Sequence, residues 1–254
     1  MNEVSPRFWE VFFNVYEHLP RQGPGNRECA KRALAFCEEL PAKPAILDMG
    51  CGSGGQTLYL AELTDGTIVA VDTHAPGIQR LIDTVAKRGL SERVRPFVAD
   101  MADTGLPPAS VDLVWSEGAF YNLGIERALE ISHGLLRPGG YLAFTECVWK
   151  KENPPEDVRT YFAEEYPTMG SVGDSLGKIH ESGFELLGHF ALPDQAWWDD
   201  FYTPMQHRLH VLRTDYSGDD EALAALEQIG QEPEFFRVNA DYFGYEFFIA
   251  RRKG

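Results

Sequence analysis

Short apolar runs alternate with amphipathic stretches along the first part of the chain. Each run has the length and composition of a buried strand, and the predicted strands cover residues 45–47, 68–71, 94–98, 111–115 and 141–144. Between them, apolar positions recur at helical spacing, and the predicted helices cover residues 26–40, 56–63, 76–88 and 124–136. Strands and helices that alternate in this way predict an α/β fold, with a parallel sheet covered by helices on both faces.

The last third of the chain departs from this alternation. Strand-like runs at 184–192 and 245–250 are predicted to complete the sheet. Between them, Thr203 and Pro204 are typical of a helix N-cap followed by a proline in the first turn, and residues 222–229 carry another helical stripe. The pattern therefore predicts extra helices inserted between the last strands.

Length and charge narrow the class of protein. The 254 residues, 44% hydrophobic and 24% charged, have an ordinary globular composition, and we predict a single domain over 1–254. The 23 Lys and Arg against 39 Asp and Glu give a net charge of −16. Such a surface repels nucleic-acid phosphates and anionic lipids, so neither nucleic acid nor a membrane is an expected partner. The pattern leaves a homodimer open.

Neither cysteines nor histidines suggest a metal site. The four cysteines lack a paired spacing, which argues against both a disulfide framework and a zinc site and suits a reducing compartment. No apolar run approaches the length of about 18 residues that a membrane span requires. The first residues also lack the features of a signal peptide. A cytoplasmic location is therefore expected.

A glycine-rich turn lies directly between the first predicted strand and the next helix, in the sequence ILDMGCGSGG at 46–55. Glycines such as Gly50 and Gly52 allow a sharp turn and a close approach to a ligand, and the following helix N-terminus favours an anionic group. Gly50, Gly52 and Gly55 also satisfy the GxGxxG pattern. By itself, the turn fits either a nicotinamide dinucleotide or another adenosyl cofactor.

Acidic residues at the ends of three predicted strands favour an adenosyl cofactor other than a nicotinamide dinucleotide. Asp48, just before the turn, would repel a pyrophosphate but attract the ammonium of an amino-acid ligand. Asp72 ends the second strand, where an acidic residue accepts ribose hydroxyls of either cofactor. Asp100 and Met101 follow the third strand, where a carboxylate suits the adenine amino group and a methionine packs on the ring.

With these residues in place, the chain resembles the class I S-adenosylmethionine-dependent methyltransferases. The matching segments are LDMGCGSGG (47–55), VAVD (69–72), VADM (98–101), SVDLVWSEGAFYNLG (110–124) and LRPGGYLAFTE (136–146), in the family's order. The resemblance implies a Rossmann-like sheet of seven strands, six parallel and the last antiparallel. It also implies an enzyme that uses S-adenosylmethionine, and we expect it to methylate a small-molecule acceptor.

The resemblance also assigns the cofactor site. It places Asp48 and Gly50 at the methionine end, Asp72 at the ribose, Asp100 and Met101 at the adenine, and Glu117 near the sulfonium or the substrate. Gly52 and Thr73 are further candidates for cofactor binding. Arg21, in a loop before the first predicted helix, is a further candidate, because a guanidinium suits the cofactor's carboxylate. An ordinary solvated arginine is the alternative for that position.

Aromatic segments outside the sheet are expected to form the acceptor site. Small-molecule pockets are mostly apolar with a few placed polar groups. Most of these aromatic side chains are expected to pack the extra helices onto the sheet, but we expect at least one of Trp149, Trp197 and Tyr202 to line the pocket as a substrate-binding residue. Glu117 and Tyr121 are expected to form its floor as the candidate catalytic residues. The expected lid elements are residues 1–20, 148–170 and 194–240.

Two other classes remain open at this stage. One is a nicotinamide-dependent oxidoreductase, against which Asp48 and Asp100 argue. The other is a non-catalytic module that binds S-adenosylmethionine. The acceptor atom, the use of a general base and the pathway are not specified by the pattern.

Overall fold

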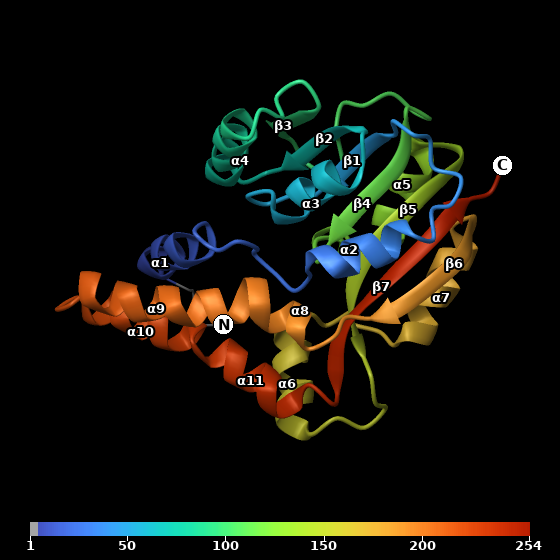
Figure 1. Ribbon diagram of the computed structural model, residues 1–254. Coiled ribbons are helices and arrows are strands. Elements are labelled where there is room, and N and C mark those ends of the chain that lie inside the picture. The colour runs from blue at the N-terminus through green and yellow to red at the C-terminus, as the bar shows by residue number, and fades with distance from the viewer. Residues whose placement is uncertain (1–4) are drawn as a thin grey trace.

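A seven-stranded mixed sheet forms the centre of the molecule, in the order β3-β2-β1-β4-β5-β7-β6 (Figure 1). The computed structural model describes residues 5–254. Its strands are β1 (Ala45–Met49), β2 (Thr67–Asp72), β3 (Val94–Val98), β4 (Val111–Glu117), β5 (Leu136–Trp149), β6 (Phe184–Ala191) and β7 (Phe243–Arg252). Strand β7 is antiparallel to both of its neighbours, whereas the others run in one direction. This topology confirms the predicted Rossmann-like fold and its antiparallel last strand.

Helices surround the sheet in three groups (Figure 1). One face is covered by α2 (Arg27–Leu34), α3 (Gly55–Leu63) and α4 (Ala75–Lys87), and the other by α5 (Ile125–Leu135) and α7 (Val172–Glu181). The third group comprises α1 (Pro6–Tyr16), α6 (Glu156–Glu165), α8 (Gln195–Trp197), α9 (Thr203–Asp215), α10 (Asp220–Ile229) and α11 (Gln231–Asn239). We call this third group the helical layer. The arrowheads of β2 and β4 point towards it (Figure 1).

The side chains of β1 point alternately to the two faces of the sheet. Ile46 packs in the core under α2, α3 and α4, whereas Leu47 and Met49 pack in the core under α5 and α7. Burial on both faces is the expected state of a central parallel strand. The helical layer has an apolar core of its own, in which Val11 of α1 joins Leu226 of α10. The N-terminal helix is therefore held by the C-terminal insertion.

The predicted helix over 26–40 is shorter in the structure. Asn26 caps α2 by accepting from the Cys29 backbone N–H, and the helix ends at Leu34. The next residues form turns, in which the backbone N–H of Cys37 donates to the Leu34 carbonyl. Cys37 is still buried in the core on this face of the sheet, so the predicted apolar positions beyond Leu34 pack as expected although they are not helical.

The expected N-cap at Thr203 is wrong. The residues before it are already helical, because α8 continues through a π-helical turn over Trp198–Tyr202 directly into α9. Tyr202 has helical dihedrals and no side-chain cap is present. A π-turn lacks some of the regular backbone hydrogen bonds, so Pro204, which has no N–H to donate, is tolerated next to it.

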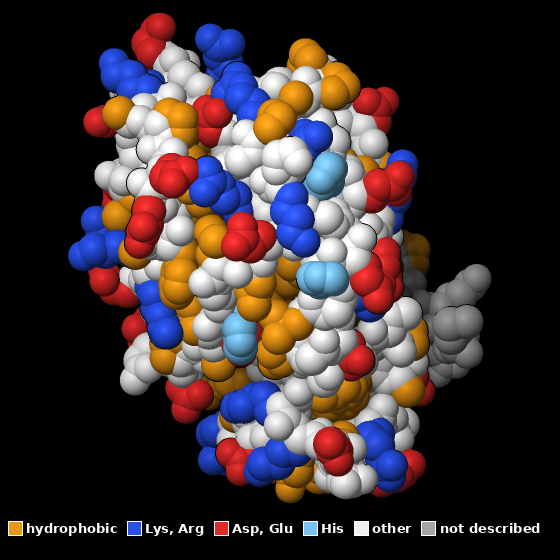
Figure 2. Space-filling view, turned by 90° about the vertical axis from the view of Figure 1, so that its right-hand side faces the viewer, with side chains coloured by type: hydrophobic (Ala, Val, Ile, Leu, Met, Phe, Trp, Pro, Cys, Tyr) orange, Lys and Arg blue, Asp and Glu red, His pale blue; other side chains and the backbone are white. Residues whose placement is uncertain are grey.

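No helix within residues 5–254 combines the length and the apolar character needed to cross a bilayer. On the side of the molecule that carries β6 and α7, acidic and basic side chains are interspersed with hydrophobic ones (Figure 2). The negative charge of the sequence is therefore not gathered into one patch on that side. Residues 1–4 of the expected N-terminal lid element lie outside the described part of the chain.

Candidate functional site

A cavity of about 610 Å³ lies between the carboxyl ends of the strands and the helical layer. Its volume is within the range of about 300–1,000 Å³ that is usual for small-ligand sites. One end is lined by the glycine turn after β1 and by the tip of β2. The other end is lined by aromatic side chains of α1, α6 and the segments between β6 and β7. Open α/β sheets bind ligands at this edge of the sheet.

The glycine turn has a backbone that other residues rarely adopt. Gly50 and Gly52 have φ angles of 72° and 54°. A Cβ on Gly50 would stand 2.3 Å from the Cβ of Ala119, and one on Gly52 would stand 2.0 Å from Oε1 of Gln22. Glycine is therefore required at both positions, and the bare backbone of the turn forms part of the cavity wall.

Asp48 lies beneath this turn and does not line the cavity. Thr57 Oγ1 donates to its Oδ2 at 2.5 Å, and Gln56 Nε2 donates to Oδ1 at 3.3 Å. Complete burial raises the pKa of Asp48 to about 7. These contacts tie the first turn of α3 to the end of β1, so Asp48 positions the glycine turn from below.

Asp72 stands at the tip of β2 and faces the cavity. Its Oδ2 accepts from the Gly52 backbone N–H at 2.9 Å, and its Oδ1 accepts from the His74 backbone N–H at 2.8 Å. An ionised carboxylate has about four acceptor sites, so both oxygens can accept further hydrogen bonds. The two backbone donors fix the carboxylate in an orientation suited to a pair of neighbouring hydroxyls.

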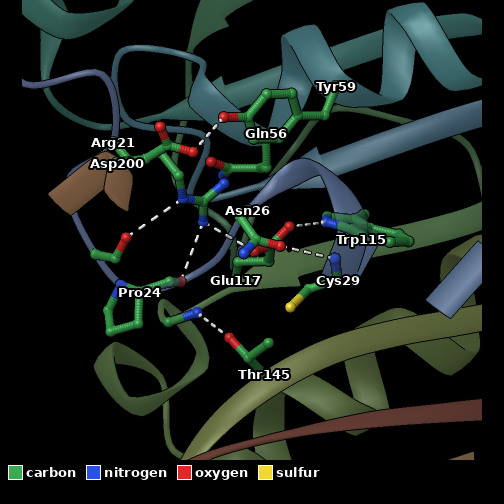
Figure 3. Close-up of polar contacts among 12 residues, drawn as sticks. Arg21, Pro24, Asn26, Cys29, Gln56, Tyr59, Trp115, Glu117, Thr145 and Asp200 are labelled. Atoms are coloured by element: carbon green, nitrogen blue, oxygen red, sulfur yellow. Dashed lines mark hydrogen bonds and ion pairs between the residues drawn. The ribbon is translucent and has the colours of Figure 1, made fainter. Parts of the chain in front are cut away.

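Arg21 and Glu117 form a buried ion pair at the end of β4 (Figure 3). Arg21 Nη2 lies 2.8 Å from Glu117 Oε2 and also donates to the Pro24 carbonyl at 3.2 Å. The other Glu117 oxygen accepts from Trp115 Nε1 at 2.8 Å. Both oxygens of Glu117 are therefore held. Arg21 Nη1, by contrast, is buried and has no hydrogen-bond partner among residues 5–254.

His74 holds the end of α1 over the part of the cavity that the glycine turn lines. The imidazole stacks on Phe13 with ring centroids 4.4 Å apart and planes 10° apart. Its Nε2 lies 2.6 Å from Oε1 of Glu17, which follows α1. Glu17 also pairs with Arg80 of α4 at 3.2 Å. Phe13 and His74 both line the cavity, so α1 is part of its wall.

A carboxylate that sequence reasoning missed lies at the aromatic end. Glu232, in the first turn of α11, accepts from the Tyr16 hydroxyl at 2.7 Å and from the Tyr202 hydroxyl at 3.0 Å. Burial raises the pKa of Glu232. Its α11 was not among the predicted helices, and no local motif marks it. The only sequence signal was the density of aromatic residues in the segments around it.

The structure brings most of the predicted site residues to this one cavity. Those that line it are Arg21, Gly50, Gly52, Asp72, Glu117, Tyr121, Trp197 and Tyr202. Asp48, Thr73, Asp100, Met101 and Trp149 do not.

The contacts of Trp149, Asp100 and Met101 show where these residues lie instead. Trp149 donates from Nε1 to the Met169 carbonyl at 3.1 Å and so points away. Asp100 is exposed and caps its own turn by accepting from the Ala102 backbone N–H at 2.8 Å. Met101 borders the glycine turn, with Sδ 3.5 Å from the point where a Cβ on Gly50 would stand.

Within the described residues, no group of three or more His, Cys, Asp or Glu side chains is arranged to hold a metal ion. The cavity instead fits an organic cofactor with a carboxylate. The buried Nη1 of Arg21 and the bare backbone of the glycine turn in the cavity wall are the two observations behind this fit.

Comparisons with known proteins agree with this geometry. Residues 47–144 match a family described as methyltransferase domain. The chain is 25% identical over 177 residues to a sterol 24-C-methyltransferase of Gibberella zeae, covering 66% of this chain and 46% of that protein. It is 28% identical over 172 residues to phosphoethanolamine N-methyltransferase 1 of Arabidopsis thaliana, covering 66% and 35%. The chain thus spans about half or less of the length of these curated relatives.

Solved structures share the fold over nearly the whole chain. YjhP from E. coli superposes with a TM-score of 0.81 at 18% identity, covering 96% of this chain and all of that one (100%). A methyltransferase from Geobacter sulfurreducens, solved with S-adenosyl-L-homocysteine, gives 0.80 at 18% identity, covering 96% and 98%. At this identity the likeness is one of fold.

Residues 47–144 thus match the methyltransferase domain family, and the sheet has the fold of solved S-adenosylmethionine-dependent methyltransferases.

Proposed function

We propose that this chain transfers the methyl group of S-adenosylmethionine to a small-molecule acceptor. The observation that carries the proposal is one continuous cavity, with the glycine turn and Asp72 at one end and an aromatic chamber at the other. Helices of the helical layer wall this chamber. A chamber of this kind favours a small acceptor over the side chain of a folded macromolecule.

Bound S-adenosylmethionine supplies a methyl group that its sulfonium already activates. The task of the chain is then to hold the two reactants in line and to exclude water, and orientation alone contributes on the order of 7–11 kcal/mol to such reactions. We assign the two carboxylate oxygens of Asp72 to the ribose hydroxyls. We assign the unpartnered Nη1 of Arg21 to the carboxylate of the cofactor. Asp100 and Met101 stay candidates for the adenine end.

Glu117 is a positioning residue in this proposal. Since its carboxylate is fully buried and ion-paired with the Arg21 guanidinium, it is poorly placed to take a proton from the acceptor. It holds Arg21 at the cavity wall. Tyr121, which lines the cavity, stays the candidate for contact with the acceptor.

The same proposal covers the organisation of the chain. We infer that residues 1–254 act as one methyltransferase domain, in which the elements near 1–20, 148–170 and 194–240 form a lid over the acceptor. Support comes from the cavity lining, to which α1, α6 and the segment from α8 to α11 contribute. The family match also disfavours the nicotinamide-dependent oxidoreductase alternative.

Two partner predictions accompany this function. The net charge of −16 leads us to expect no affinity for nucleic acid or anionic membranes. A gel-shift titration at physiological salt that gave a dissociation constant below about 1 μM would contradict this, because non-specific binding lies at about 10⁻⁴–10⁻⁶ M. The cytoplasmic location and a homodimer stay predictions.

The proposed activity is tested by incubating the protein with methyl-labelled S-adenosylmethionine and a metabolite extract. The label is expected to appear in the small-molecule fraction. Label confined to protein or nucleic acid would contradict a small-molecule acceptor. Absence of any transfer by a protein that binds the cofactor would favour the non-catalytic module instead.

A further inference from the structure

The two ends of the cavity differ in charge. Basic side chains line only the cofactor end among the described residues, where Arg21 pairs with Glu117 and His74 bonds to Glu17. The aromatic end carries two carboxylates, Glu232 and the more exposed Glu165, and no Lys, Arg or His among its described lining residues. A carboxylate enclosed by protein is normally paired with a cation.

Glu232 has two hydrogen-bond donors, and none of the described residues that line its end of the cavity is a cation. The Tyr16 hydroxyl donates to Oε2 and the Tyr202 hydroxyl donates to Oε1. Each oxygen therefore has a fixed direction and one further acceptor site. Two tyrosine donors stabilise the charged carboxylate without neutralising it, so the negative charge of Glu232 acts on the aromatic chamber.

Aromatic rings line the same end of the cavity as this carboxylate and add to the attraction of that end for a cation. Tyr161 and Phe235 approach each other with ring centroids 4.4 Å apart, and Trp197 stacks on Phe236 at 4.0 Å. All four side chains line the same end of the cavity. The faces of such rings carry negative potential and bind ammonium groups. An aromatic chamber with a carboxylate in its wall is the chemistry that recognises an organic cation.

We propose that the acceptor is a small organic amine, which enters as its ammonium and is bound by Glu232. This inference rests on the proposed function, because it names the acceptor of the same cavity. It also excludes classes of acceptor. A phosphate or carboxylate group at this end would face Glu232 and Glu165 with no cation to offset them.

The transfer requires the amine to lose a proton first. The ammonium gives one proton to a Glu232 oxygen, which leaves a lone pair on nitrogen. The nitrogen attacks the methyl carbon, the N–C bond forms as the S–C bond breaks, and the bonding pair returns to sulfur. The product is a methylated ammonium with S-adenosylhomocysteine, and Glu232 later releases the proton to water. Burial, which raises the pKa of Glu232, makes the carboxylate a better proton acceptor.

The test uses the full chain saturated with S-adenosylhomocysteine and a panel of small aromatic and aliphatic amines. Each amine is compared with the alcohol and the carboxylic acid of the same skeleton by titration calorimetry. We expect the amines that bind to exceed their alcohols about tenfold or more in affinity, and the acids to bind weakest. Methyl transfer to the same amines is then followed by mass spectrometry.

A matched pair of variants isolates the carboxylate. Glu232→Gln is expected to weaken amine binding by about 10- to 100-fold, because a charged hydrogen bond is lost, while alcohols are little affected. Glu234→Gln is the control, since Glu234 lies on the same helix, is exposed and pairs with Arg237. Unchanged affinity for S-adenosylhomocysteine in both variants shows that the fold is intact.

The experiment distinguishes a failure of the amine proposal from a failure of the proposed function. Alcohols or acids that bind as tightly as the amines, amine binding unchanged in Glu232→Gln, or no amine binding by a protein that binds S-adenosylhomocysteine would overturn the amine proposal alone. A chain that fails to bind S-adenosylhomocysteine would instead count against the proposed function.

Discussion

Arg21 Nη2 lies 2.8 Å from Oε2 of Glu117, and the two side chains are 3% and 0% exposed. This pair joins the loop before α2 to the end of β4. The loop is also held by the Gly25 backbone N–H, which donates to the Ala196 carbonyl at 2.8 Å. One ion pair therefore connects the sheet, the loop that borders the cavity and, through that loop, the helical layer.

Breaking this pair from one side should destabilise the protein strongly. Glu117→Gln removes the charge and leaves the Arg21 guanidinium buried without its partner, which costs about 3–5 kcal/mol in comparable cases. The double variant Arg21→Met with Glu117→Gln should recover part of that loss. Urea unfolding of the two single variants and the double variant measures the coupling. Additive losses would show that the two side chains do not depend on one another.

Asp72 should control cofactor affinity. Asp72→Asn turns one hydrogen-bond acceptor into a donor that opposes the N–H groups of Gly52 and His74. We expect binding of S-adenosylhomocysteine to weaken by about 10- to 100-fold. Asp83→Asn, an exposed change on α4, serves as the control and should leave affinity unaltered. Equal affinities for both variants in calorimetry would remove Asp72 from the ribose site.

The sheet and the cofactor end of the cavity could be predicted because local sequence determines them. Apolar runs determine the strands, and the turn needs glycines because its backbone adopts positive φ angles within a few residues. The side-chain direction of Asp48 was harder to foresee. Asp48 is two residues after Ile46, so strand alternation turns it towards α3 and away from the cavity.

The acceptor end could not be predicted in the same way. Glu232 contacts Tyr16 across 216 positions of the chain, and Phe13 reaches His74 only when α1 packs against α9 and α10. Such contacts depend on how separate helices pack, and no motif near either residue encodes that packing. The aromatic composition of these segments predicted a pocket but not the carboxylate inside it.

Stability should depend on pH through Asp48. Its pKa is raised from 3.8 to about 7 in the folded protein, so folding binds a proton between these values. The contribution to stability is complete below about pH 4, falls as the pH rises to about 7 and is absent above that. Asp48→Asn should flatten this part of the profile and be a few kcal/mol more stable than the native chain at pH 8, since a shift of one unit is worth about 1.4 kcal/mol.

Urea unfolding at several pH values between 4 and 8 tests this expectation. The exposed variant Asp83→Asn should reproduce the native profile. A native profile that rises over this interval, or an Asp48→Asn profile parallel to the native one, would show that Asp48 is ionised throughout.

Ligand binding should stiffen α1. Because Phe13 and Tyr16 line the cavity, a cofactor that contacts them lowers the population of states in which α1 has detached. Backbone amides of α1 should therefore exchange hydrogen more slowly with S-adenosylhomocysteine present. Phe13→Ala, which removes the stack on His74, should reduce this protection more than Trp9→Ala, whose ring lies outside the cavity lining. Identical amide exchange rates with and without ligand would show that α1 does not contact the bound cofactor.

The central claim is that the cavity at the ends of β1, β2 and β4 holds an S-adenosyl cofactor. Calorimetric titration of S-adenosylhomocysteine and of a nicotinamide dinucleotide into the same preparation tests it most directly. We expect S-adenosylhomocysteine to bind with a dissociation constant in the micromolar range, about −8 kcal/mol, and the dinucleotide to give no measurable heat. Preferential binding of the dinucleotide, or binding of neither ligand, would contradict it.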